Sequence, residues 1–189
     1  MTNQASARAG IYRISTDALF IALYVVLSTF LSFKIPGLVQ ISFSTLPILL
    51  CAFLFGPLDA AAVALLGTLI EQIVDPSPYG FATLPIWLIP GLVMALIAAF
   101  GARGVRHIAK NSLLFVVLSG AVIVLAELSL TGCNTVALYI DAHLLHYPVP
   151  AIHVLLPTRL INGLARGVIS CVLVPILLKP LRRVLARRG

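Results

Sequence analysis

The sequence predicts an all-α membrane protein of six transmembrane helices, with both termini on the cytoplasmic side. Two observations predict this class: an apolar composition and the placement of the basic residues. Of the 189 residues, 60% are hydrophobic and only 10% are charged, which is too little charge to cover a soluble domain of this length. Apolar runs continue almost from end to end, so we expect residues 1–189 to form one integral membrane domain.

Six apolar segments are expected to cross the membrane, at residues 16–33, 39–55, 59–74, 81–102, 112–140 and 157–178. The second and third are short beside the ~20 residues that a span needs, which predicts tilted, irregular or partly re-entrant segments. Pro85 and Pro90 predict a kink in the outer half of the fourth segment. The fifth segment is long enough to extend beyond the bilayer.

The basic residues indicate the orientation. Of the 13 Lys and Arg residues, ten fall on one side of the six-span arrangement, Lys34 falls on the other, and Arg159 and Arg166 lie within a span. Such an excess marks the cytoplasmic side, and an even number of spans places both termini there. The net charge of +7 is therefore interpreted as an orientation signal, and no nucleic-acid partner is expected. The ten residues are Arg8, Arg13, Arg103, Arg106, Lys110, Lys179, Arg182, Arg183, Arg187 and Arg188.

Charged side chains within the spans indicate a polar interior. Measured from the cytoplasmic ends of their spans, Glu127 lies ~22 Å deep and Arg166 and Glu71 each ~18 Å deep, at ~1.5 Å per residue. Because a charge at the membrane centre costs ~2.5–3.5 kcal/mol, we expect Arg166 to form a structural ion pair with Glu127 or Glu71. Arg159 lies two turns nearer the outer surface. It is expected to hold a ligand carboxylate or a polar loop group; the alternative is an arginine that snorkels to the headgroups.

Polar and aromatic residues at the outer side complete the expected binding site. Asn134 and Asn162 lie at outer depths similar to that of Arg159. The long connection at 141–156 is expected to act as a semi-rigid lid that carries Tyr147. Tyr79 and Trp87 either stack on a flat ligand ring or belong to the aromatic belt of the membrane interface.

No catalytic or metal-binding pattern is apparent. His143, His146 and His153 have a spacing that a helix face could use, but Pro148 and Pro150 interrupt it. The three cysteines have no paired spacing, and the motifs of hydrolases, metalloproteases and nucleotide-binding loops are absent. We therefore expect neither an enzyme nor a cofactor or metal.

Ala18 and Ala22 lie four residues apart in the first span, a spacing of small residues that lets another helix approach closely. Together with the six-span plan, the chain resembles the substrate-binding S component of energy-coupling factor (ECF) vitamin transporters, and most of all the folate family. The similar fragments, in order, are "QISFSTLPILLCAFLFGPLDAAAVALLGTLIEQIV", "YGFATLPIWLIPGLV", "NTVALYI" and "LLPTRLINGL".

The resemblance implies a mechanism in the plasma membrane of a prokaryote. The S component binds a vitamin from outside, associates with a transmembrane coupling subunit and two ATPase subunits, and topples within the bilayer to release the vitamin. It implies that Ala18 and Ala22 contact the coupling subunit and that Arg159 matches a motif arginine. Gln40 and Ser42 are expected at the substrate site, although the folate pattern has a basic residue where Gln40 stands. Folate carries two carboxylates and pantothenate one, so both substrates stay open.

Two functions of other classes also stay open. One is a stand-alone proton-coupled transporter that uses Glu71 and Glu127 as relays, although the chain shows no internal inverted repeat. The other is a structural membrane protein of a wall-building assembly, in which the buried arginines serve packing alone.

Overall fold

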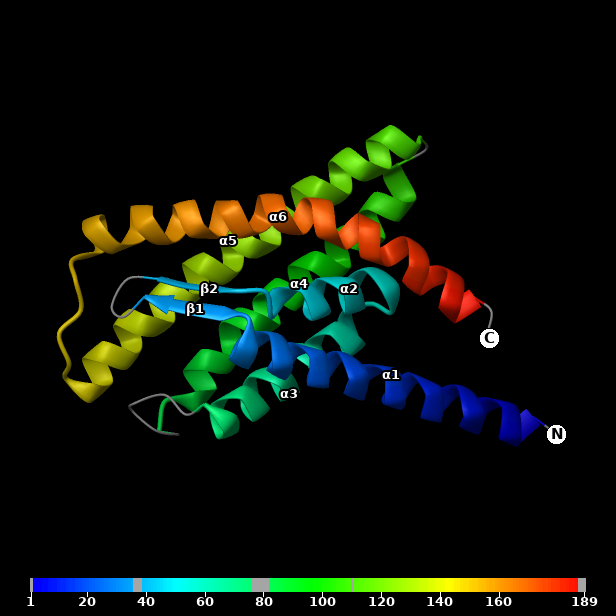
Figure 1. Ribbon diagram of the computed structural model, residues 1–189, viewed down its shortest axis with the longest axis horizontal. Coiled ribbons are helices and arrows are strands. Elements are labelled where there is room, and N and C mark those ends of the chain that lie inside the picture. Colours follow the sequence, from blue (N-terminus) through cyan, green and yellow to red (C-terminus); the bar gives the residue numbers. More distant parts are fainter. Residues whose placement is uncertain (1, 36–38, 76–81, 110, 187–189) are drawn as a thin grey trace.

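Within the residues that it describes, the computed structural model of the protein has six helices and one short hairpin (Figure 1). The structure describes residues 2–35, 39–75, 82–109 and 111–186. In chain order the elements are α1 (Thr2–Phe30), β1 (Ser32–Ile35), β2 (Val39–Ser42), α2 (Thr45–Leu54), α3 (Pro57–Val74), α4 (Leu84–Ile108), α5 (Ser112–Leu145) and α6 (Ile152–Ala186).

The elements define two ends of the molecule. The start of α1, the end of α6 and the turn from α4 to α5 lie at one end, which we call the terminal end (Figure 1). The hairpin, the end of α3, the start of α4 and the connection from α5 to α6 lie toward the opposite end, which we call the hairpin end.

The helical membrane class is confirmed, because all helices except α2 are long and apolar enough to cross a membrane. Several helices extend past the expected spans. The first helix begins at Thr2 rather than at residue 16, and α6 covers Ile152–Ala186 rather than 157–178. The extensions at the start of α1 and at the end of α6 carry basic residues, which a span defined by apolar composition excludes.

The segment at 39–55, whose shortness predicted an irregular or partly re-entrant segment, is not one continuous helix. This segment divides into strand β2 and helix α2, which has only 10 residues and is therefore ~15 Å long at 1.5 Å per residue. The turn between them is held by Ser42, whose Oγ donates to Ser44 Oγ (3.0 Å) and accepts from the Ser44 backbone N–H (3.2 Å). Local side-chain bonds of this kind compete with helix formation.

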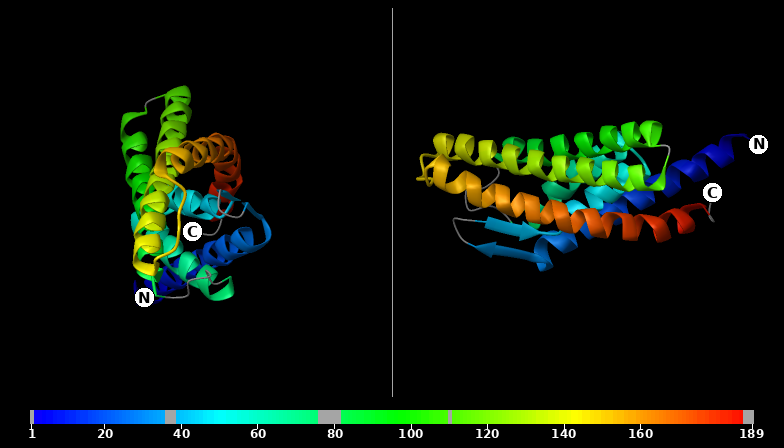
Figure 2. Two further views of the ribbon diagram at one scale, coloured as in Figure 1. Left: turned by 90° about the vertical axis from the view of Figure 1, so that its left-hand side faces the viewer. Right: turned by 90° about the horizontal axis from the view of Figure 1, so that it is seen from above.

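The hairpin itself departs from the all-α prediction. Strands β1 and β2 pair antiparallel, with Ser32 opposite Ser42, Lys34 opposite Gln40 and Ile35 opposite Val39. Polar and apolar residues alternate along both strands, as expected for strands with two different faces. The hairpin lies beside the first half of α6 in both Figure 1 and Figure 2, and β2 contacts that helix.

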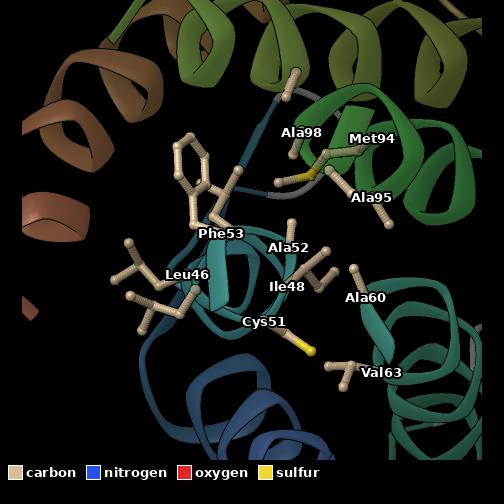
Figure 3. Packing of buried hydrophobic residues seen from close by; sticks show 14 of the residues in the cluster. Leu46, Ile48, Cys51, Ala52, Phe53, Ala60, Val63, Met94, Ala95 and Ala98 are labelled. Carbon is tan, nitrogen blue, oxygen red and sulfur yellow. The ribbon is translucent and has the colours of Figure 1, made fainter. Parts of the chain in front are cut away.

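Helix α2 is the centre of the core. Every residue from Thr45 to Phe53 is buried, and α1, α3, α4 and α6 all contact this helix. Figure 3 shows α2 facing Ala60 and Val63 of α3 and, on an adjacent side, Met94, Ala95 and Ala98 of α4. Small residues at these contacts let the helix backbones approach closely, as in other membrane bundles.

Candidate functional site

Arg159 stands near the hairpin end of α6, on the side that faces α5. Its side chain is partly buried, and Nη1 donates a long hydrogen bond to the Asn134 carbonyl of α5 (3.4 Å). Tyr139 and Tyr147 are titratable groups near it. Within the described part of the chain, no carboxylate lies within ion-pair distance of Arg159. A carboxylate or another anion is the group that would complete its bonding.

Asn162 lies one turn further along α6 on the same face as Arg159. Its Nδ2 donates to the Thr158 carbonyl (2.7 Å), which fixes the orientation of the amide. Asn134, in contrast, contributes its backbone carbonyl to Arg159. Arg159, Asn134 and Asn162, which were predicted as site residues, therefore lie together on the facing sides of α5 and α6.

The connection from α5 to α6 is shorter than the predicted loop at 141–156, because α5 continues to Leu145 and α6 begins at Ile152. His146 ends α5 in the left-handed conformation, with φ 59°. Tyr147 OH donates to Asp141 Oδ2 (2.9 Å), and Tyr139 OH donates to the Pro150 carbonyl (2.6 Å). Two tyrosines thus hold this connection against the end of α5.

Three buried polar atoms at this end have no protein partner among the described residues: Thr83 Oγ1, Trp87 Nε1 and Asp141 Oδ1. A Cβ added at Gly101 of α4 would meet the Val122 side chain of α5. Thr83 precedes Gly101 by as many residues as Ile140 follows Val122. Since α4 and α5 are antiparallel, Thr83 lies at the level of Ile140, the residue before Asp141. Buried polar atoms normally have a partner, so these three are suited to bind water or a polar ligand.

Arg166 and Glu127 lie deeper, in the middle of the bundle. Arg166 Nε is 3.8 Å from Glu127 Oε2, and Arg166 Nη2 donates to Thr131 Oγ1 (3.1 Å). The Glu127 side chain is fully buried, and the hydroxyls of Thr45 and Ser170 lie beside it. Of the two acids predicted as alternatives, Glu127 is the one that approaches Arg166.

Glu71 lies on another side of the bundle. Its Oε2 accepts a hydrogen bond from Tyr24 OH (2.8 Å), and the same hydroxyl is 3.3 Å from Thr68 Oγ1. The ring of Tyr24 packs on Gly67, where a Cβ would be 2.8 Å from the ring. The structure therefore places Glu71 in the contact between α1 and α3, apart from Arg159.

The other predicted residues occupy separate places. Gln40 lies in β2 opposite Lys34, and Ser42 forms the turn before α2. Trp87 lies in the first turn of α4, and Tyr79 lies outside the described residues. Ala18 and Ala22 are exposed on α1. Across the described ranges, the histidines, cysteines and acids form no group of three that could hold a metal.

Sequence reasoning did not select Thr83, Tyr139 or Asp141 for the substrate site. Asp141 has a signal in the sequence, because it is an acid between two apolar helical turns. Thr83 and Tyr139 have none, because a hydroxyl at the end of a membrane helix commonly faces the interface.

Comparison with known proteins identifies the family. The family model described as "ECF transporter, substrate-specific component" matches residues 13–178. The chain belongs to this family. A solved structure of the S component of a bacterial ECF transporter superposes with a TM-score of 0.66 at 19% sequence identity, over 93% of this chain and 98% of that one. This likeness shows a shared fold. The comparison with curated proteins found no match.

As a substrate-specific component, the chain is a membrane-embedded, substrate-binding subunit of a transporter and is not itself an enzyme. Membership implies association with the other subunits of an ECF transporter and a small-molecule substrate. The resemblance to S components predicted from the alanine pair and the order of the fragments is thereby confirmed at the level of the family.

Proposed function

We propose that this S component binds a carboxylate-bearing vitamin at the hairpin end and delivers it inward. The observation that carries the proposal is Arg159, a partly buried cation without an acidic partner in the described residues. An unpaired charge in a membrane bundle is costly and normally marks a functional site. Asn162 and Asn134 flank this cation, and Tyr147 holds the connection above it.

The proposed topology has six crossings in one domain, with both termini in the cytoplasm of a prokaryotic cell. Five long helices provide five crossings, and the hairpin with α2 provides the sixth. The clustered Lys and Arg residues near the terminal end support the cytoplasmic assignment of that end. The hairpin end then faces outward, where a vitamin arrives.

Folate is the proposed substrate, with pantothenate as the alternative. Arg159 would bind a carboxylate of the glutamate tail. A pteridine ring carries adjacent N–H donors and ring acceptors, and it matches the unpartnered Asp141 Oδ1, Thr83 Oγ1 and Trp87 Nε1. Pantothenate has one carboxylate and no flat ring. It would therefore use Arg159 and leave the three unpartnered atoms of Asp141, Thr83 and Trp87 unused. Gln40 stands where the folate pattern has a basic residue. This one difference favours the alternative, pantothenate, which carries the lower charge.

Energy for uptake comes, in this proposal, from two ATPase subunits that act through a membrane coupling subunit. The exposed pair Ala18 and Ala22 on α1 supports a contact with that subunit, because small residues admit a close helix. A proton relay through Glu127 and Glu71 is less well supported. Arg166 lies beside Glu127, and Tyr24 bonds to Glu71.

The test is ligand binding by the chain purified alone in detergent. Mass spectrometry of the purified protein identifies any bound vitamin, and calorimetry with folate and pantothenate decides between them. Removing one partner of a buried charge pair costs ~2–5 kcal/mol, so Arg159→Gln should weaken binding about thirtyfold or more. Arg106→Gln, at the terminal end, is the matched control. Unchanged affinity in Arg159→Gln, or no vitamin bound at all, would refute the proposed site.

A further inference from the structure

A groove opens between α5 and α6 at the terminal end, away from Arg159. Cys171 Sγ donates to the Gly120 carbonyl (3.3 Å) and holds the two helices together. Beyond this contact α6 contains Pro175, and the last third of α6 turns away from the start of α5 (Figures 1 and 2). The space between them is a groove of about 290 Å³.

The walls of the groove are apolar and its length fits one membrane leaflet. Phe53 of α2 lies in it, together with Phe115 and Ile123 of α5 and Val174 and Leu178 of α6. From Val174 to Arg183 the groove follows α6 for ~14 Å at 1.5 Å per residue. Half of a ~30 Å hydrocarbon core is similar, so the groove matches an acyl chain that lies along the bundle.

The rim of the groove at the helix end is cationic. Lys179, Arg182 and Arg183 line it and are exposed. Helix α6 contains no acid, and α5 contains none before Glu127. Within the described residues, none of the three cations has an acidic partner. Three neighbouring positive charges at the end of an apolar groove are complementary to an anionic headgroup.

Ser119 is a buried polar residue at the inner end of the groove. It precedes Gly120, at the contact with Cys171 where the groove closes, and its side chain is buried, with 3% exposed. Its Oγ has no hydrogen-bond partner in the described part of the chain. A serine in a membrane helix often bonds to a backbone carbonyl in its own preceding turn. Here the described residues provide no such bond, and the hydroxyl lines the inner end of the groove.

We propose that this groove is a binding site for one anionic phospholipid, such as phosphatidylglycerol. Its phosphate is bound by Lys179, Arg182 and Arg183, and one acyl chain fills the apolar space between α5 and α6. With the terminal end in the cytoplasm, as proposed above, the lipid belongs to the inner leaflet. The site lies at the end of the bundle opposite Arg159 and does not depend on the identity of the vitamin.

The experiment is native mass spectrometry of the full chain, without vitamin or partner subunits, released from nanodiscs of phosphatidylglycerol and phosphatidylcholine in equal amounts. The variant Arg182→Gln/Arg183→Gln removes two charges at the rim. The matched control Arg103→Gln/Arg106→Gln removes two charges from the same end of the molecule, on α4. A third variant, Val116→Trp, fills the groove from its exposed wall without a change of charge.

The wild-type chain should retain one phosphatidylglycerol in preference to phosphatidylcholine. Retention should fall on the order of tenfold in Arg182→Gln/Arg183→Gln, given the contribution of each basic residue near an anionic surface. It should also fall in Val116→Trp and stay unchanged in the α4 control. Equal retention of both lipids, or equal loss in both double variants, would overturn the proposal. Full lipid retention by Arg182→Gln/Arg183→Gln, together with weaker assembly of this variant with the coupling subunit, would also overturn the proposal. The groove would then be a contact site for the coupling subunit.

Discussion

Arg13 of α1 and Asp59 of α3 are joined by two parallel hydrogen bonds, from Nε to Oδ1 and from Nη2 to Oδ2, each 2.7 Å long. The fork geometry of the guanidinium matches both carboxylate oxygens. The pair ties the first part of α1 to the first turn of α3, near the terminal end. It therefore holds the helix that carries Ala18 and Ala22, the face proposed to contact the coupling subunit.

Substitution of Arg13 should loosen this attachment more than substitution of its partner. Asp59 is buried, with 7% of its side chain exposed, whereas 53% of the Arg13 side chain is exposed. Arg13→Gln leaves a buried carboxylate without its cation, but Asp59→Asn leaves an arginine that water can solvate. We expect a lower melting temperature in detergent for Arg13→Gln than for Asp59→Asn. Arg106→Gln is the control, and an inverted order would argue against this asymmetry.

Gly163 is expected to be intolerant of any side chain. A Cβ there would overlap Thr131 Oγ1, the atom to which Arg166 Nη2 donates. Gly163→Ala should therefore separate α5 from α6 and destabilise the chain by ~1–3 kcal/mol, the usual cost of overpacking. Gly132 of α5, in contrast, has no neighbouring atom within 4 Å of such a Cβ. Gly132→Ala should be neutral or stabilising by up to ~1 kcal/mol.

Thermal unfolding in detergent compares the two glycine variants directly. An equal effect of both substitutions would show that helix propensity, rather than the close contact at Gly163, decides the outcome.

The charges of Arg166 and Glu127 should be strongly coupled. Arg166→Met leaves the fully buried Glu127 without a cation and should destabilise the chain by ~3–5 kcal/mol, whereas a well-packed apolar replacement of both partners is often tolerated. We expect Arg166→Met/Glu127→Leu to recover most of that loss. Chemical denaturation of the two single variants and the double variant forms a complete cycle. Additive losses would show that the two side chains do not interact.

The alanine face of α1 should matter for transport and not for binding. Ala18→Trp places a large ring on an exposed position of α1, so it should block association with the coupling subunit while the vitamin site stays intact. Uptake by cells that contain the complete transporter should be lost, and calorimetry on the purified variant should give the wild-type affinity. Ala121→Trp, on an exposed position of α5, is the control. Parallel loss of binding and uptake would contradict the assigned role.

Helix positions follow from the sequence because lipid demands long apolar runs, and five such runs became long helices. The hairpin was missed because residues 39–42 were counted with the apolar run of α2. The alternation of polar and apolar residues in 32–35 and 39–42, around Pro36 and Gly37, is a strand signal of period two. A composition window does not detect this period, since half of each strand is apolar.

The candidate site was predictable in its charged members and in the two asparagines at the depth of Arg159. Arg159 and Arg166 stand out because a charge is rare in an apolar run, whatever its surroundings. The partner of Arg166 was not predictable, because Glu71 and Glu127 have similar depths and only the three-dimensional packing brings one of them close. The pairing of Arg13 with Asp59, which are 46 residues apart, was not predictable for the same reason. In the sequence, Arg13 is only an orientation signal and Asp59 only marks the start of a helix.

The hairpin determines how far water enters the helix bundle at the depth of the two strands. Two strands satisfy only the backbone groups that face each other, so the outer edge of each strand carries amide and carbonyl groups that lipid cannot bond. Such backbone persists at membrane depth only where protein covers it or water reaches it. Helix α6 contacts β2, and we expect water to hydrate the rest of the hairpin. Arg159, on the same part of α6, would then carry its charge in a hydrated vestibule, and a vitamin would reach it without leaving water.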